Sequence, residues 1–215
     1  MALHDELEAF NRGFVAQVPD NIVRTMNDAV QILQSSGLTE RALQAGQQHA
    51  PDFDLPELNG EKVKLSEALK RGVVVITFYR GSWCPYCNLE MQALQKALPD
   101  IEAAGAQLIA IAPELPEFAA QTRDKGNLTF PLLSDQNNET AKQYGLVFTL
   151  PESLRPIYES FGIDLPASHG NDHFELPMPA TYIIAPDGKV MSAFVDVDYT
   201  KRMEPSDIIK ILKTI

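Results

Sequence analysis

The sequence predicts an α/β fold, a central mixed β-sheet flanked by helices, preceded by an N-terminal helical extension. From residue 73 onward, short apolar or β-branched runs alternate with segments whose apolar residues recur at helical spacing. This β-α-β-α order requires a largely parallel or mixed sheet with helices on its faces. Residues 1–45 show helical spacing only. We therefore expect an extension over residues 1–45 and one α/β domain over residues 46–215.

Two helices are expected in the extension, separated by a break at Pro19-Asp20, where Asp20 can cap the second helix. Their apolar positions follow helical spacing: Leu3, Leu7, Phe10 and Phe14, then Ile22, Met26, Val30 and Leu33. We expect the two helices to form a hairpin that packs on the domain. A dimerisation arm, which would make a homodimer, or a lid is the alternative.

The α/β domain opens with a hairpin and continues with alternating strands and helices. Strands are expected at 53–55, 63–65, 73–77, 107–112, 129–133, 180–185 and 190–197. Helices are expected after Ser66, which can cap the first of them, then at 85–101 and 116–125, before Tyr144, and from Pro205 to Ile215. The irregular residues 146–178 contain four prolines and a helical patch at 154–161, as functional loops often do.

Composition and charge limit the class of function. The 215 residues are 45% hydrophobic and 22% charged, a balance typical of globular proteins. A net charge of −11 argues against nucleic acid and against anionic membrane surfaces as partners. No apolar run approaches the roughly eighteen residues of a membrane span, and residues 1–20 show no signal peptide. Because the chain has only two cysteines, we predict a cytoplasmic location.

The two cysteines lie where a strand ends and a helix begins. Val73–Thr77 is the buried strand, and Cys84-Pro85-Tyr86-Cys87 follows an aromatic pair and a turn at Gly81. A free thiol is only roughly 3% ionised at pH 7, whereas helix N-termini and Cys-x-x-Cys motifs lower the thiol pKa. Because positions three apart share one helix face, Cys84 and Cys87 can alternate between dithiol and disulfide.

Other uses of the cysteines fit less well. A zinc site would need a second pair of ligands, and only His169 and His173 are spaced as one, so we expect no metal and no cofactor. The position at a strand-to-helix junction also disfavours a role for the two cysteines as inert buried thiols. The two histidines are expected in a surface loop, and Asp196, Asp198 and Arg202 on a solvated face.

Four segments of the chain carry a family resemblance: APDFDL with NGEKVKLSEAL, VVVITFYRGSWCPYCNLE, FPLLSD, and PATYIIAPDGKV. They span about residues 46–197 and resemble the thioredoxin-fold superfamily, and within it the peroxiredoxin-like proteins of the alkyl hydroperoxide reductase/thiol-specific antioxidant (AhpC/TSA) family. APDF followed by FPLLSD is fairly specific to the peroxiredoxin branch, whereas WCPYC alone indicates only a thioredoxin-like protein. The resemblance implies a thioredoxin-like fold and a thiol-based redox enzyme.

The chain departs from the peroxiredoxin pattern at three positions. Counted from Phe78-Tyr79, the family's proline falls on Arg80 and its threonine on Cys84, while its peroxide-activating arginine falls on Pro179. The family's peroxidatic cysteine falls on Cys87. Peroxide reduction needs donors that stabilise the departing oxygen, so Arg80 or backbone N–H groups of residues 81–84 would have to supply them.

The departures resemble thioredoxin-like proteins, in which a cis-proline lies beside the disulfide. Met178–Pro179 is the matching bond, and Cys84 would then be the exposed attacking cysteine. The peroxiredoxin pattern favours Cys87 as the attacker instead. Trp83 and Tyr86 flank the cysteines and are expected to shape a flat apolar docking surface.

Three hypotheses of function follow. The first is a thiol-dependent peroxidase with Cys84 and Cys87 as peroxidatic and resolving partners, recharged by a thioredoxin-like protein or a low-molecular-weight thiol. The second is a thiol–disulfide oxidoreductase that acts on protein disulfides. The third is a redox-sensing interaction protein whose N-terminal helices bind a partner in one oxidation state.

Overall fold

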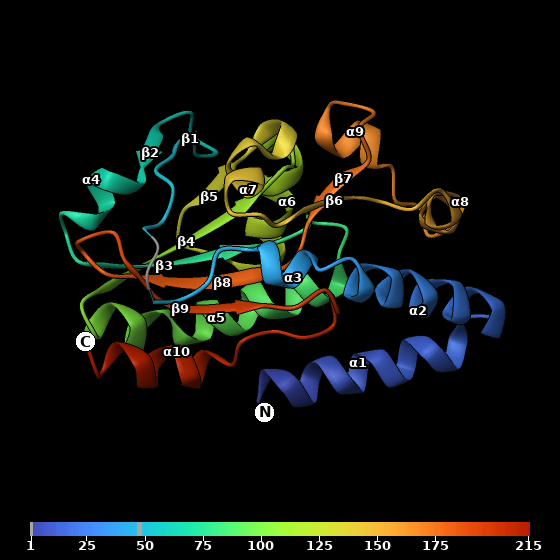
Figure 1. The fold of residues 1–215 in the computed structure, drawn as a ribbon, viewed down its shortest axis with the longest axis horizontal. Helices are drawn as coiled ribbons and strands as arrows, with labels where there is room; N and C mark the ends of the chain where they lie inside the picture. Colours follow the sequence, from blue (N-terminus) through green and yellow to red (C-terminus); the bar gives the residue numbers. More distant parts are fainter. Residues whose placement is uncertain (1, 47–48) are drawn as a thin grey trace.

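The computed structural model describes residues 2–46 and 49–215, and a five-stranded sheet forms its centre (Figure 1). In spatial order its strands are β5 (Leu132–Ser134), β4 (Ala106–Ala112), β3 (Val73–Phe78), β8 (Ala180–Ile184) and β9 (Val190–Val195). β3, β4 and β5 run parallel to one another, whereas β8 is antiparallel to β3 and β9 is antiparallel to β8. The predicted mixed sheet is confirmed.

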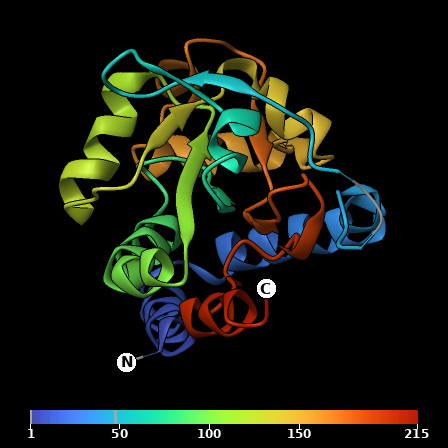
Figure 2. The same ribbon diagram turned by 90° about the vertical axis from the view of Figure 1, so that its left-hand side faces the viewer.

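Helices cover both faces of this sheet (Figure 2). One face carries α1 (Leu3–Gln17), α5 (Pro85–Ala103) and α10 (Pro205–Leu212), with α6 (Pro116–Gly126) beside α5 and β5; the other carries α3 (Leu38–Arg41), α4 (Leu65–Leu69) and α7 (Glu139–Gln143). Successive side chains of a strand point to opposite faces, so Val75 packs in the α5 layer and Val74 in the α4 layer.

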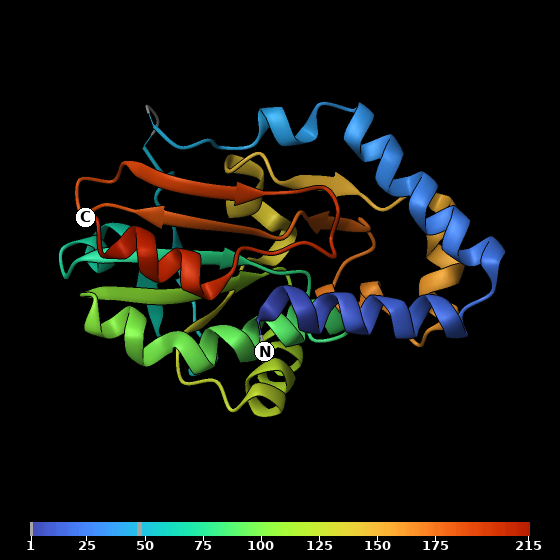
Figure 3. The same ribbon diagram turned by 90° about the horizontal axis from the view of Figure 1, so that it is seen from below.

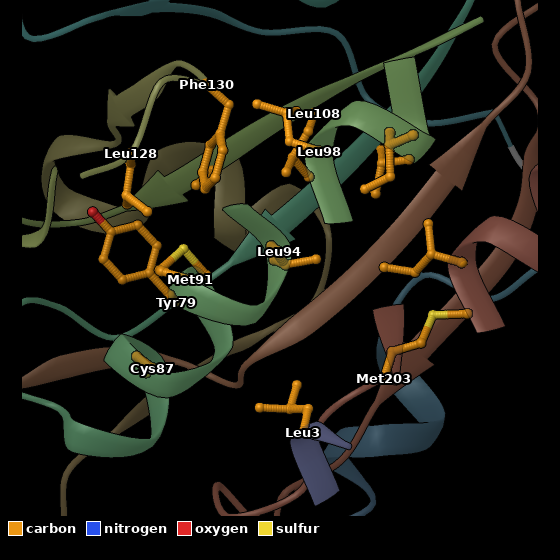
Figure 4. Packing of buried hydrophobic residues seen from close by; sticks show 14 of the residues in the cluster. Leu3, Tyr79, Cys87, Met91, Leu94, Leu98, Leu108, Leu128, Phe130 and Met203 are labelled. Atoms are coloured by element: carbon orange, nitrogen blue, oxygen red, sulfur yellow. The ribbon is translucent and has the colours of Figure 1, made fainter. Parts of the chain in front are cut away.

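The buried face of α5 anchors the cysteine pair to the core. Met91, Leu94 and Leu98 pack with Leu108 of β4 and with Phe130, and Figure 4 shows Cys87 on the same helix, one turn before Met91. Burying each such side chain contributes about 1.5–3 kcal/mol. The first turn of α5 is therefore held in place by the core behind it.

The N-terminal helices pack on the rest of the protein. α1 lies along α5, and its Leu3 and Leu7 belong to the core under that helix. The Glu204 carboxylate accepts the unpaired backbone N–H groups of Leu3 at 3.2 Å and His4 at 2.5 Å, which suits the positive end of a helix. α2 (Asp20–Ser35) turns away from α1, and the two meet at the end of the molecule where α8 (Arg155–Ser160) lies (Figure 3).

The remaining elements lie around the sheet. β1 (Asp54–Pro56) and β2 (Lys62–Lys64) form the expected hairpin. The segment 146–178 is more regular than expected, because β6 (Val147–Thr149) pairs with β7 (Glu175–Pro177) around α8 and α9 (Leu165–His169). Two short 3₁₀ turns, Gln136–Asn138 and Glu152–Leu154, precede α7 and α8.

Three local expectations are wrong. Ser66 lies inside α4, and its backbone N–H donates to Asp52 Oδ1 at 2.9 Å, so Asp52 performs the capping role. Asp20 is the first residue of α2 and its side chain makes no capping hydrogen bond. Ile215 is exposed rather than part of the core face of α10.

Within residues 2–46 and 49–215, no helix combines the length and the apolar character that crossing a membrane requires.

Candidate active site

The loop between β3 and α5 positions the two cysteines. Cys84 is the N-cap of α5 and a proline follows it at the first helical position, as predicted. Gly81 has a φ of +143°, and a Cβ on it would lie 2.5 Å from Trp83 Nε1 and 2.7 Å from Glu114 Oε1. This close approach lets the buried Glu114 carboxylate accept the backbone N–H and the hydroxyl of Ser82, each at 2.8 Å. The loop is therefore held by a glycine and by a buried carboxylate.

The two thiols are reduced and in contact. The Cys87 thiol donates a hydrogen bond to Cys84 Sγ at 2.9 Å, and the backbone N–H of Arg80 donates to Cys87 Sγ at 3.5 Å. Cys84 is 2% exposed and Cys87 is fully buried. The expectation of an exposed Cys84 is thus wrong, although Cys84 is the thiol that lines a cavity.

Arg202 provides a buried positive charge at the cysteine pair. Its Nη2 donates to Cys87 Sγ at 3.3 Å, and its Nε donates to Glu90 Oε2 at 2.5 Å. Nη1 donates to the backbone oxygens of Tyr199 and Lys201. Arg202 does not lie on a solvated face, as expected from sequence, because the segment between β9 and α10 folds over α5.

Arg80 provides a second buried positive charge. Its guanidinium lies 4.9 Å from the Tyr199 ring centroid, 5.1 Å from that of Trp83 and 5.7 Å from that of Tyr158, which are cation–π distances. Its Nη2 donates to the Tyr158 hydroxyl. Its buried Nε has no hydrogen-bond partner among the described residues. Arg80 therefore adds a positive charge that acts on Cys84.

These groups separate the pKa values of the two thiols. Burial would raise the pKa of Cys84, but the hydrogen bond from Cys87 and the charges of Arg80 and Arg202 outweigh it and lower that pKa to about 6. Burial raises the pKa of Cys87, and donating its proton to Cys84 raises it further. At pH 7, Cys84 is the thiolate and Cys87 the thiol.

Burial also shifts the pKa of Glu90. Removal from water raises it to about 7, although the neighbouring Arg202 charge acts in the opposite direction. Glu90 accepts from Thr77 Oγ1 at 3.3 Å on its other side. Near neutral pH this carboxyl can therefore hold or release a proton next to the cation that touches Cys87.

A cavity of about 300 Å³ opens at Cys84 and Arg80. Most of its lining is aromatic and comes from four parts of the chain: Phe10 and Phe14 of α1, Trp83 and Tyr86 beside the cysteines, Tyr158 and Phe161 in and after α8, and Tyr199 after β9. The flat docking surface expected at Trp83 and Tyr86 is absent from the described residues. Tyr86 is buried, its hydroxyl donates to Asn11 Oδ1 at 2.9 Å, and its ring meets Phe10 edge to face.

Pro179 lies close to the site but not in the expected geometry. It lines a cavity of about 20 Å³ together with Arg80, Tyr158 and Tyr199. The Met178–Pro179 bond is trans, as are all peptide bonds of the described residues, so the expected cis-proline is wrong. His173 is exposed as expected, whereas His169 is buried, and burial lowers its pKa to about 4 with help from the Arg80 charge.

Sequence reasoning missed Glu90 altogether. The apolar residues of α5 recur at Cys87, Met91 and Leu94, and Glu90 falls on the same face at the spacing of a core position. A charged residue on a buried helix face requires a partner, so the position of Glu90 could have indicated a buried ion pair. Its partner, Arg202, lies 112 residues later in the chain, and no local pattern identifies it.

Comparisons with known proteins identify a matching family and several relatives. The model of the AhpC/TSA family matches residues 47–193. A putative peroxiredoxin of Mycobacterium tuberculosis (strain H37Rv) is 38% identical over 96 residues, which cover 45% of this chain and 60% of the relative. The thiol-disulfide oxidoreductase ResA of Halalkalibacterium halodurans is 30% identical over 113 residues, 52% of this chain and 63% of the relative. The chain spans about three fifths of the length of the curated relatives it matches.

Solved structures confirm the thioredoxin-like fold. The crystal structure of peroxidoxin BcpB from Mycobacterium tuberculosis superposes with a TM-score of 0.63 at 21% identity, covering 80% of this chain and 98% of the other. At that identity the likeness concerns the fold alone. The family model extends over more than half of the sequence, from before β1 into β9. This chain therefore belongs to the AhpC/TSA family.

Proposed function

We propose that this protein is a thiol-dependent peroxidase in which Cys84 attacks the peroxide and Cys87 resolves the product. One observation carries the proposal: Cys84 lines a cavity and accepts a hydrogen bond from the Cys87 thiol. The pKa of Cys84 is lowered to about 6, whereas the pKa of Cys87 is raised, so that Cys87 stays protonated. A thiolate with its resolving thiol already in contact suits a rapid two-step cycle. The peroxiredoxin pattern alone would assign the attack to Cys87, which is fully buried.

The cycle begins with the Cys84 thiolate, which attacks the terminal oxygen of a hydroperoxide. The S–O bond forms as the O–O bond breaks, which leaves a sulfenic acid on Cys84 and an alkoxide or hydroxide that takes a proton from solvent. Arg80 lines the same cavity, and its guanidinium would donate to the departing oxygen. Arg80 would thereby replace the arginine whose family position holds Pro179.

The second step forms the disulfide. Cys87 Sγ attacks the sulfenic sulfur, the new S–S bond forms, and the hydroxyl leaves as water after taking the Cys87 proton. The sulfurs are already 2.9 Å apart, so the step needs little backbone movement. Arg202 touches Cys87 and favours its ionised form during this attack.

The remaining parts of the proposal concern partners, location and organisation. A thioredoxin-like protein or a low-molecular-weight thiol would return the disulfide to the dithiol. We infer a cytoplasmic location, because a pair that must be re-reduced suits a reducing compartment. We assign the redox chemistry to a domain over residues 46–215, with residues 1–45 as its extension. A homodimer through that extension stays the alternative to the packing described above.

A second candidate is a thiol–disulfide oxidoreductase. The likeness to ResA and the Cys84-Pro85-Tyr86-Cys87 motif with a low first pKa favour it. In this case, Cys84 would attack a substrate disulfide and Cys87 would release the mixed disulfide. The partner sulfur would have to enter the aromatic cavity to reach Cys84.

Stopped-flow fluorescence separates the two candidates. Trp83 is the only tryptophan and adjoins Cys84, so its emission reports oxidation of the pair. Reduced protein is mixed with hydrogen peroxide and, separately, with an oxidised protein disulfide, with Cys84→Ser as the control for signals that do not come from the pair. A peroxide reaction several orders faster than that of free cysteine supports the peroxidase. A peroxide reaction no faster than free cysteine, with a fast disulfide reaction, refutes it and favours the oxidoreductase.

A further inference from the structure

The outer wall of the Cys84 cavity comes from helices that the family model does not cover. Phe10 and Phe14 lie on α1 and Met26 on α2, whereas the match begins at residue 47. The wall is fixed in place, because Leu3 and Leu7 of α1 belong to the main core. The access to Cys84 is thus shaped by a segment outside the family match.

Aromatic contacts join this wall to both sides of the cavity. Phe10 meets Tyr86 edge to face at 5.0 Å between ring centroids, and Phe14 meets Phe161, which follows α8, at 5.8 Å. Phe10 and Phe14 are themselves stacked at 6.5 Å. The rings form a continuous apolar surface from α1 across to the end of α8. A molecule that reaches Cys84 through this cavity passes along these rings.

The cavity also contains one polar feature suited to a ligand. Arg80 is almost fully buried, lines the cavity, and has an Nε–H without a partner among the described residues. A ligand that accepts a hydrogen bond from the Arg80 guanidinium has an oxygen at the Cys84 end, and the rings require an apolar body beyond that oxygen. Hydrogen peroxide could meet only the first requirement. A cavity of about 300 Å³ is at the small end for ligand sites and suits a single ring with short substituents.

We propose that Phe10, Phe14 and Met26 determine substrate specificity, and that they select a hydroperoxide with an aryl substituent over hydrogen peroxide. The aryl ring packs edge to face against the phenylalanines while the O–O group lies between Cys84 Sγ and the Arg80 guanidinium. This inference rests on the proposed peroxidase function. The Cys84 thiolate takes the terminal oxygen and becomes the sulfenic acid, and the aryl alkoxide takes a proton from solvent and leaves as the alcohol. Cys87 then supplies the two electrons that release water and form the disulfide.

The test compares two peroxides on four proteins. Second-order rate constants for oxidation are measured by Trp83 fluorescence with cumene hydroperoxide and with hydrogen peroxide, and their ratio is the specificity. Loss of one aromatic contact is worth a factor of about two to ten, so the combined Phe10→Ala and Phe14→Ala variant is expected to lower the ratio about tenfold. Met26→Ala changes the same wall from α2 and is expected to lower the ratio without altering α1. Val15→Ala is the matched control, because Val15 is an exposed residue of α1 that does not line the cavity.

A binding measurement makes the inference independent of turnover. Cumyl alcohol, the product of the aryl peroxide, is titrated into Cys84→Ser and followed by Trp83 fluorescence. Saturable binding that Phe10→Ala and Phe14→Ala together weaken supports the inference. No saturable binding, or a rate ratio that is the same in wild type and in both wall variants, overturns it. Slow oxidation of the wild type by both peroxides refutes the peroxidase itself, and the cumyl alcohol titration still decides whether the cavity takes an aryl ligand.

Discussion

Replacing Arg80 by methionine tests whether a buried cation makes Cys84 the thiolate. Methionine keeps an apolar stem but removes the charged guanidinium that lies over the Trp83, Tyr158 and Tyr199 rings. With a pKa of about 6, Cys84 is about 90% thiolate at pH 7, whereas an ordinary thiol is about 3% ionised. Loss of one of the two nearby cations is expected to raise the Cys84 pKa by about 1–2. The thiolate fraction at pH 7 would then fall to between about 50% and about 10%.

The assay is the pH profile of alkylation by iodoacetamide, followed by mass spectrometry of the peptide that contains Cys84. Arg80→Met is expected to react about two to ten times more slowly than wild type at pH 7 and to approach it at alkaline pH. Arg80→Lys restores the charge and should recover part of the shift. Arg155→Met is the matched control, because the Arg155 guanidinium stacks on Phe174 at 4.2 Å and does not line the Cys84 cavity.

Stability is measured on the same samples, since Arg80→Met leaves the buried Tyr158 hydroxyl without its donor, at a cost of about 1–3 kcal/mol. A folded Arg80→Met protein whose Cys84 pKa equals that of wild type would refute the electrostatic account.

Three further predictions concern the surroundings of the pair. Because burial raises the pKa of Glu90 from 4.5 to about 7, this group lowers the unfolding free energy by up to about 3 kcal/mol as the pH rises from 4.5 to 7. The difference in unfolding free energy between wild type and Glu90→Gln, measured by urea denaturation, should fall with pH by this amount. A difference that does not change with pH would contradict the prediction. His169, whose pKa is lowered from 6.5 to about 4, has the opposite effect, since stability is lost as the pH falls from 6.5 to 4. The unfolding free energy of His169→Gln should therefore fall less between pH 6.5 and 4 than that of wild type. An equal fall in both proteins would contradict a buried neutral histidine. Gly81→Ala places a Cβ 2.5 Å from Trp83 Nε1, so we expect a loss of about 2 kcal/mol or more and a changed Trp83 emission, whereas wild-type values for both would contradict the loop geometry.

Local patterns in the sequence sufficed for the sheet, the helices and the place of the cysteines. A five-residue run of apolar or β-branched residues, a proline after Cys84 and helical spacing over 85–101 each depend on near neighbours in the chain, and β3 and α5 form as expected. The hairpin expected at the start of the α/β domain likewise forms. These features depend on interactions within a few residues, so single-sequence reasoning reaches them.

The electrostatic environment of the site could not be predicted in the same way. Arg202 lies in a charged stretch of sequence that is typical of the protein surface. It is nevertheless buried, in an ion pair with Glu90, which lies 112 residues earlier in the chain. His169 lies in a polar segment, and α9 carries it into the interior. Phe10 and Phe14 were correctly placed on a helix, but their contact with Tyr86 and Phe161 depends on how distant segments pack. Cys87 and Arg80, which lower the Cys84 pKa most, are near neighbours in the chain, whereas the contribution of Arg202 depends on long-range packing.

Trapping of the sulfenic acid tests the central claim, that Cys84 attacks and Cys87 resolves, most directly. Cys87→Ser and Cys84→Ser are each reduced, treated with one equivalent of cumene hydroperoxide in the presence of a dimedone-type reagent, and analysed by mass spectrometry. Our account predicts rapid labelling of Cys84 in Cys87→Ser and no rapid labelling in Cys84→Ser. Rapid labelling of Cys87 in Cys84→Ser, with Cys84 unlabelled in Cys87→Ser, would contradict it.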